Sequence, residues 1–217
     1  MLREIVSNDW FTIGLVIALI AVSIVKLLYT RRFEDFLPVL VNSKYLKIYT
    51  RDQKFIDSFD SLLFTVYILM TGIFVYISFN ALTQSNIVDP VILVKLIFAI
   101  AAFVLIKVLI ERLIGSLFEI DQLIDHYLFQ KTAYKHLTGL LLIPLNLFFI
   151  YVFEPSKVAI LIVIIAIIGI NIAGFITSFK TFQKLLISNF FYFILYLCAL
   201  EIGPYIILYH LIKSYEL

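Results

Sequence analysis

Long apolar runs separated by short polar connections dominate this chain. About twenty residues of helix cross the hydrocarbon core of a bilayer, so runs of that length predict membrane-spanning helices. The runs are continuous and do not alternate with a period of two, which favours helices over a β-barrel. We expect spans at residues 10–29, 62–79, 91–110, 137–153, 158–175 and 185–212, the last kinked at 203–204.

Two polar connections carry apolar residues at helical spacing, which is typical of amphipathic helices. The first stretch contains Pro38 and is therefore kinked or begins late; we expect it to lie among the headgroups. Its apolar residues are Phe33, Phe36, Leu37, Leu40 and Val41. The second stretch, residues 113–128, continues the third span out of the membrane with Leu113, Leu117, Ile120, Ile124, Tyr127 and Leu128 on one face. The predicted fold is all-α: a polytopic transmembrane helical bundle of about six spans plus two cytoplasmic amphipathic helices, in a single domain over residues 1–217.

Composition agrees with the pattern of apolar runs. Hydrophobic residues make up 63% of the chain and charged residues 15%, whereas soluble domains carry about 25% charged residues. The first apolar run is long enough to span and has no cleavage site after it, so we expect it to be retained. A single cysteine, Cys198, excludes an internal disulfide and a multi-cysteine metal site.

The distribution of Lys and Arg predicts the orientation of the spans. The first, third and fifth connections hold six, three and two basic residues, eleven in all. The amino-terminal tail, the other two connections and the carboxyl tail hold three: Arg3, Lys157 and Lys213. The bias places the amino terminus in the periplasm.

The strongest candidate site lies in the last span, where a carboxylate and a helix break follow sixteen residues without a charge. Carboxylates inside a membrane are costly and are functional candidates by default. The candidate functional residues are Glu201, Gly203, Pro204, Tyr205 and Tyr209. Sixteen helical residues from Leu185 cover about 24 Å, which places Glu201 near the periplasmic end. This position favours a hinge and interhelical contact, with proton or ion handling and ligand binding as the alternatives.

Other polar residues are assigned structural roles. Asp121, Asp125 and His126 have spacing that resembles a metal site, but a solvated helix face explains them better. Asp57 and Asp60 at the start of the second span are expected to cap its helix, and Asn171 and Asn189 to hydrogen-bond between helices. We find no P-loop, nucleophile or dinucleotide motif. We therefore expect no catalytic residue, cofactor or metal, and a non-enzymatic protein is favoured over an enzyme.

Three motifs give the chain a family resemblance. They are NDWFTIGLVIALI at Asn8–Ile20, RRFEDFLPVLVNSKYLKIY at Arg31–Tyr49 and EIGPYIILYHLIK at Glu201–Lys213. The chain resembles an uncharacterised integral-membrane family of bacteroidete bacteria, catalogued only as a domain of unknown function, over nearly its whole length. The resemblance implies the bacterial inner membrane as the location and supplies no reaction or substrate.

Two functions are consistent with these observations. The first is an accessory or structural subunit of a cell-envelope complex in the inner membrane. Its partners would be the lipid bilayer and a membrane-protein complex, without nucleic acid. The alternative is a small transporter or a protein that handles a lipid carrier, with Glu201, Tyr205 and Tyr209 lining a polar cleft.

Overall fold

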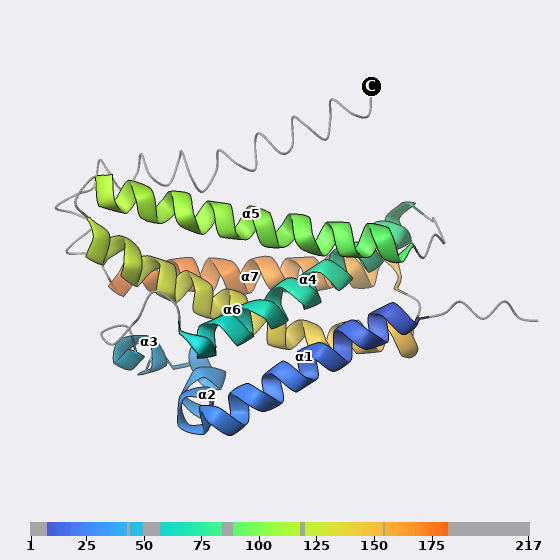
Figure 1. The fold of residues 1–217 in the computed structure, drawn as a ribbon, viewed down its shortest axis with the longest axis horizontal. Helices are drawn as coiled ribbons and strands as arrows, with labels where there is room; N and C mark the ends of the chain where they lie inside the picture. The colour runs from blue at the N-terminus through green and yellow to red at the C-terminus, as the bar shows by residue number, and fades with distance from the viewer. Residues whose placement is uncertain are drawn as a thin grey trace, which may run out of the picture.

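The computed structural model describes residues 8–42, 44–49, 57–83, 89–117, 120–153 and 155–181 (Figure 1). These residues form helices, and no strand occurs among them. The long helices are α1 (Asp9–Leu28), α4 (Ser58–Thr83), α5 (Pro90–Leu117), α6 (Asp121–Tyr151) and α7 (Lys157–Thr181). The short ones are α2 (Thr30–Phe36), the 3₁₀ helix η1 (Leu37–Leu40) and α3 (Lys44–Tyr49). The predicted all-α class is confirmed.

Five of the helices are long and apolar enough to cross a membrane: α1, α4, α5, α6 from Ile124 onward, and α7 as far as Thr177. They overlap the first five predicted spans. The sixth predicted span, residues 185–212, lies outside the described residues, as do its five candidate residues.

α4 lies at the centre of the bundle and packs against α1, α5, α6 and α7. Its most apolar window is 56% buried, against 17% for the windows of α5 and α7. The contact with α6 is the most extensive. The two backbones approach closely at Gly139, where a Cβ would stand 2.6 Å from the Cα of Tyr67. The absence of a side chain at Gly139 lets the two helix backbones meet.

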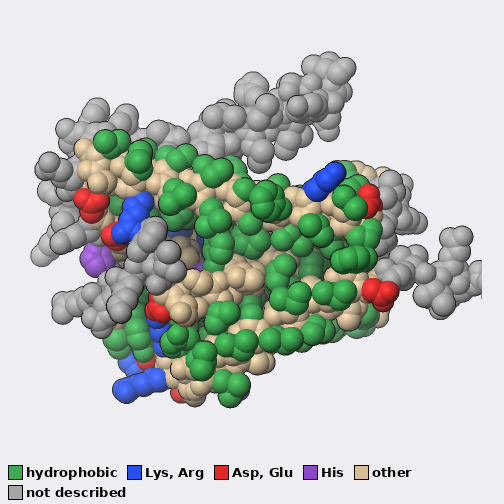
Figure 2. Space-filling model, in the orientation of Figure 1, with side chains coloured by type: hydrophobic (Ala, Val, Ile, Leu, Met, Phe, Trp, Pro, Cys, Tyr) green, Lys and Arg blue, Asp and Glu red, His purple; other side chains and the backbone are tan. Residues whose placement is uncertain are grey.

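The outer faces of the peripheral helices are covered by aliphatic and aromatic side chains. α5 exposes Phe98, Leu105 and Ile106, and α7 exposes Leu161, Ile162 and Ile165. Figure 2 shows hydrophobic side chains over most of the visible length of the bundle. Such a surface suits hydrocarbon rather than water.

The two predicted amphipathic segments have different outcomes. The first is helical but changes from α2 to η1 where Pro38 adopts φ −81° and ψ 17°, so the predicted break is present. The second was predicted as one helix over residues 113–128, and this is wrong: α5 ends at Leu117 and α6 begins at Asp121. Where the chain reverses, Gly115 leaves room for Ile124, whose nearest side-chain atoms stand 3.0 Å from a Cβ built there.

Candidate functional site

Charged side chains gather at one end of the bundle, which we call the polar end. It comprises α2, α3, the carboxyl ends of α1 and α5, and the amino ends of α4 and α6 (Figures 1 and 2). The described basic residues there are Lys26, Arg31, Arg32, Lys44, Lys47, Lys107, Arg112, Lys131 and Lys135. The opposite end has Lys95 and Lys157 among the described basic residues. The polar end is therefore where ionic interactions between helices can form.

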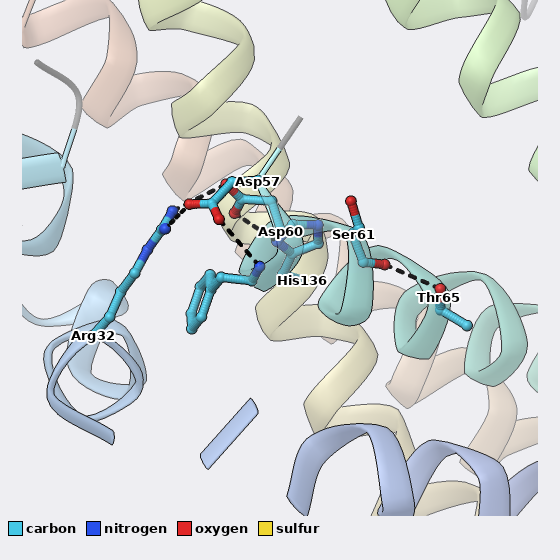
Figure 3. Close-up of polar contacts among 7 residues, drawn as sticks. Arg32, Asp57, Asp60, Ser61, Thr65 and His136 are labelled. Carbon is cyan, nitrogen blue, oxygen red and sulfur yellow. Dashed lines mark hydrogen bonds and ion pairs between the residues drawn. The ribbon is translucent and has the colours of Figure 1, made fainter. Parts of the chain in front are cut away.

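Arg32 joins the amphipathic segment to the central helix. From α2 its guanidinium forms an ion pair with Asp57, and its Nη2 lies 3.0 Å from Asp60 Oδ2 at the start of α4 (Figure 3). The ring of Phe59 lies 4.3 Å and that of Tyr49 5.3 Å from the guanidinium carbon. The Arg32 side chain is only 14% exposed. Two carboxylates and two aromatic rings thus hold one side chain, an arrangement that the planar guanidinium suits better than an ammonium.

The surroundings of Arg32 and Tyr45 determine the protonation states of these two side chains. Burial by itself lowers the pKa of Arg32, but the carboxylates of Asp60 and Asp57 raise it, and the pKa of Arg32 lies above its ordinary value. Burial raises the pKa of the Tyr45 phenol, and nearby Asp60 adds to the rise while Arg32 opposes it. Arg32 is therefore cationic, and Tyr45 a neutral phenol, across the physiological pH range.

His136 approaches the same carboxylates from α6. Its Nδ1 lies 3.8 Å from Asp60 Oδ1, and the side chain is 1% exposed (Figure 3). Neither ring nitrogen makes a hydrogen bond within the described part of the chain. Buried polar atoms usually find partners, so this imidazole is an unusual feature. Arg32, Asp57, Asp60 and His136 form what we call the clamp.

A second ionic contact joins α5 to α6. Lys131 Nζ lies 2.6 Å from Glu111 Oε1, and the Glu111 side chain is completely buried. Close by in sequence, Arg112 Nε lies 3.5 Å from Asp125 Oδ1, but these side chains are 36% and 45% exposed. A buried pair depends on both members, whereas an exposed pair contributes little.

The sequence reasoning explained part of this site and missed the rest. Asp57 Oδ1 accepts a hydrogen bond of 3.4 Å from the Phe59 amide at the start of α4, as expected of a cap. Its pairing with Arg32, 25 residues earlier, was not foreseen. His136 was not singled out at all. The available signal was Arg32 itself, a basic residue next to the apolar stripe of the first amphipathic segment.

The remaining candidates are accounted for as follows. Glu201, Gly203, Pro204, Tyr205 and Tyr209 lie outside the described residues, and so does Asn189. Among the described residues, no group of three or more His, Cys, Asp or Glu could hold a metal ion. Asp121 is exposed and Asp125 faces Arg112, which agrees with a solvated helix face.

The prediction for Asn171 is wrong. Asn171 is exposed and donates to Ile167 O of its own helix at 2.8 Å. The interhelical hydrogen bond belongs to Asn146 of α6, which is fully buried and donates to Met70 O of α4 at 2.9 Å. Both asparagines lie in apolar helices, and the sequence did not distinguish the buried one from the exposed one.

Long apolar helices around a central α4, with charged side chains at one end, define a polytopic helical membrane protein. The chain belongs to the family described as Domain of unknown function (DUF4271), whose family model matches residues 11–212. The match confirms the family resemblance seen in the sequence; the bacterial group stays a prediction. Searches of curated proteins and of solved structures gave no significant match.

Proposed function

We propose that this protein is a non-enzymatic subunit of a cell-envelope complex in the bacterial inner membrane. In this proposal the polar end faces the cytoplasm and contacts a second protein, and the amino terminus faces the periplasm. The excess of Lys and Arg at the polar end supports this orientation, because basic residues are retained on the cytoplasmic side.

The observation that carries the proposal is the exposed end of α5. This helix has 28 residues and is about 42 Å long, whereas the hydrocarbon core is about 30 Å thick. Lys107 and Glu111 mark the level at which charged side chains enter the bundle. Beyond that level, Leu113 is 62% and Leu117 71% exposed.

Leucine side chains that lie outside the hydrocarbon core are exposed to water unless another molecule covers them. Large exposed apolar side chains beyond the membrane commonly mark contacts with other proteins. Arg112, which directly precedes Leu113, pairs with Asp125 of α6 at the surface, and a polar rim around an apolar centre is typical of protein interfaces. These features support the end of α5 as the docking surface.

Site-specific photocrosslinking in cells that naturally produce the protein tests this proposal. A photoreactive amino acid at Leu117 is expected to give a discrete adduct with a second protein. The matched control is Leu105 of the same helix, which is 50% exposed within the span and is expected to give lipid adducts. Lipid adducts alone at both positions would overturn the proposal.

Substitution provides an independent test. Leu113→Ser combined with Leu117→Ser is expected to abolish recovery of the crosslinked partner in mild detergent, while Leu113→Met with Leu117→Met preserves it. Both pairs change exposed side chains, so abundance in the membrane should stay near that of the unaltered protein. A monodisperse monomer that purifies from native membranes without any partner would count heavily against docking.

The clamp favours a second candidate function, a small transporter or a protein that handles a lipid carrier. Ionisable groups buried among membrane helices are functional candidates by default, and His136 is buried beside Asp60 without a hydrogen bond to any described residue. In this proposal Glu201, Tyr205 and Tyr209 line a separate polar cleft near the periplasmic end of the last predicted span. Glu201→Gln should then abolish activity while abundance is unchanged. An equal loss of abundance would indicate a structural role for Glu201.

A further inference from the structure

We infer that the hairpin made of α2, η1 and α3 binds anionic phospholipid headgroups. The hairpin surface consists of the exposed apolar side chains of Leu37, Leu40 and Val41 together with the exposed basic side chains of Arg31 and Lys47. This surface and its ligand differ from the end of α5 and its protein partner, so the inference goes beyond the proposed function and stands independently of it.

The position of the hairpin along the chain places it at headgroup level. α1 has 20 residues, a length of about 30 Å that matches the hydrocarbon core. α2 begins at Thr30, separated from α1 by Tyr29 alone. With no linker to carry it away, the hairpin starts where the hydrocarbon ends.

The underside of the hairpin fixes its orientation. Phe33, Phe36, Val39 and Tyr45 are buried against the bundle, and the rings of Phe36 and Tyr45 meet edge to face at 5.3 Å. Arg32 adds the ion pairs to Asp57 and Asp60. Because these side chains pack against the bundle, the opposite side of the hairpin faces outward.

The exposed side chains of η1 and of the residue after it are apolar. Val41 is 93% exposed directly after η1, and Leu37 and Leu40 are about half exposed at 49% and 46%. Removing apolar surface from water is favourable by about 25 cal/mol per Å². At the membrane boundary, the region just below the phosphates offers these side chains that apolar environment.

The exposed charges on the same hairpin select the lipid. Lys44 is exposed but pairs with Asp35 at 3.1 Å, and Arg32 is held by Asp57 and Asp60. Arg31 and Lys47 are the exposed cations of the hairpin that join no ion pair among the described residues, and Lys26 is exposed at the end of α1. The exposed acid within the described hairpin residues is Glu34. Aliphatic side chains flanked by a surplus of basic ones are complementary to an anionic lipid surface rather than to a neutral one.

Lipid retention by the full-length protein tests the charge selection. Protein reconstituted with mixed phosphatidylcholine and phosphatidylglycerol is expected to retain phosphatidylglycerol preferentially, as measured by native mass spectrometry. Arg31→Gln with Lys47→Gln should lower the retained ratio about fivefold for each charge removed. Arg31→Lys with Lys47→Arg should preserve the ratio, and Lys157→Gln at the opposite end should leave it unchanged. No preference, or a preference that the double Gln variant keeps, would overturn the inference.

Insertion is tested separately at Val41. An environment-sensitive fluorophore on Val41→Cys, in a Cys198→Ser background, is expected to report an apolar environment and to be quenched by lipids that carry a quencher near the headgroup. Quenching should be stronger in vesicles containing phosphatidylglycerol. Emission typical of water in both kinds of vesicle would refute insertion, and so would a protein adduct in place of lipid from a photocrosslinker at Val41.

Discussion

Gly139 of α6 lies directly against the backbone of Tyr67 in α4, and a Cβ on Gly139 would stand 2.6 Å from the Tyr67 Cα and 3.0 Å from its nitrogen. Backbone atoms cannot rotate away as the end of a side chain can. We therefore expect Gly139→Ala to push α4 and α6 apart and to lower the free energy of unfolding by about 1–3 kcal/mol. Thermal or denaturant unfolding in detergent measures the loss.

The control for this substitution is Gly169→Ala in α7, where the added Cβ meets no described heavy atom within 4 Å apart from its chain neighbours and the adjacent backbone of its own helix. Alanine has the higher helix propensity, so this variant should be as stable as the unaltered protein or slightly more stable. Equal stability of the Gly139→Ala and Gly169→Ala variants would show that the two helices do not meet at Gly139.

Removal of Arg32 should loosen the hairpin. Arg32→Ala leaves Asp57 and Asp60 facing each other without their cation, and breaking a fully buried pair costs about 3–5 kcal/mol. The two carboxylates keep 28% and 21% exposure, so we expect about 2–3 kcal/mol. Limited proteolysis should cut the hairpin faster in this variant.

The neighbouring residue provides the control for Arg32. Arg31 is exposed, and Arg31→Ala should change stability by no more than about 0.5 kcal/mol. Arg32→Lys should give an intermediate loss of stability. An ammonium keeps the charge but cannot make the bidentate contact with the two carboxylates or stack on Phe59. Equal protease resistance of the Arg31→Ala and Arg32→Ala variants would contradict the clamp.

The pair of Glu111 and Lys131 should behave as one unit. Glu111→Leu alone replaces the carboxylate that pairs with Lys131 by an apolar side chain, and the free energy of unfolding is expected to fall by about 3–5 kcal/mol. Glu111→Leu with Lys131→Leu should recover most of that loss, because well-packed apolar residues often replace a buried ion pair at little cost. A double-mutant cycle from unfolding in detergent measures the coupling.

The exposed pair of Arg112 and Asp125, which also joins α5 to α6, is the control for that experiment. Arg112→Gln breaks the 3.5 Å contact with Asp125, and we expect a loss below about 1 kcal/mol. Strict additivity of the Glu111 and Lys131 substitutions would indicate that the two side chains do not interact.

Asn146 should contribute more to stability than Asn171. Asn146→Ala removes the 2.9 Å hydrogen bond to Met70 O between α6 and α4 and leaves a small cavity, for an expected loss of about 1–2 kcal/mol. Asn171→Ala removes only a hydrogen bond within α7 at an exposed position, so its effect on unfolding should be close to zero. A larger loss of stability for Asn171→Ala than for Asn146→Ala would contradict the burial of Asn146 and the exposure of Asn171.

The sequence predicted the fold class well because spans are encoded locally. A run such as residues 158–175 must form all its backbone hydrogen bonds within one helix, whatever surrounds it. The turn between α5 and α6 was missed because apolar periodicity continues from Leu113 to Leu128 on both sides of it. Apolar periodicity indicates only which positions face an apolar environment. Gly115 allows the chain to reverse without interrupting this periodicity.

The clamp was less predictable because it depends on packing between distant segments. Asp60 and His136 are 76 positions apart in the sequence, and nothing local indicates that α4 and α6 bring them within 3.8 Å. The capping role of Asp57 was visible from its place before a helix. Its second role follows only once α2 has folded back onto the start of α4.

The central position of α4 also affects how the protein is made. α4 is the most buried of the five candidate spans, yet its main partner α6 is not complete until Tyr151 has been synthesised. At about 5–20 residues per second, the interval between the ends of the two helices lasts several seconds. During that time the face of α4 that will meet Gly139 lies open to lipid, to insertion chaperones and to membrane proteases. A substitution that weakens the α4–α6 contact therefore acts twice: it slows the closure of this face once α6 is complete, and it destabilises the finished bundle.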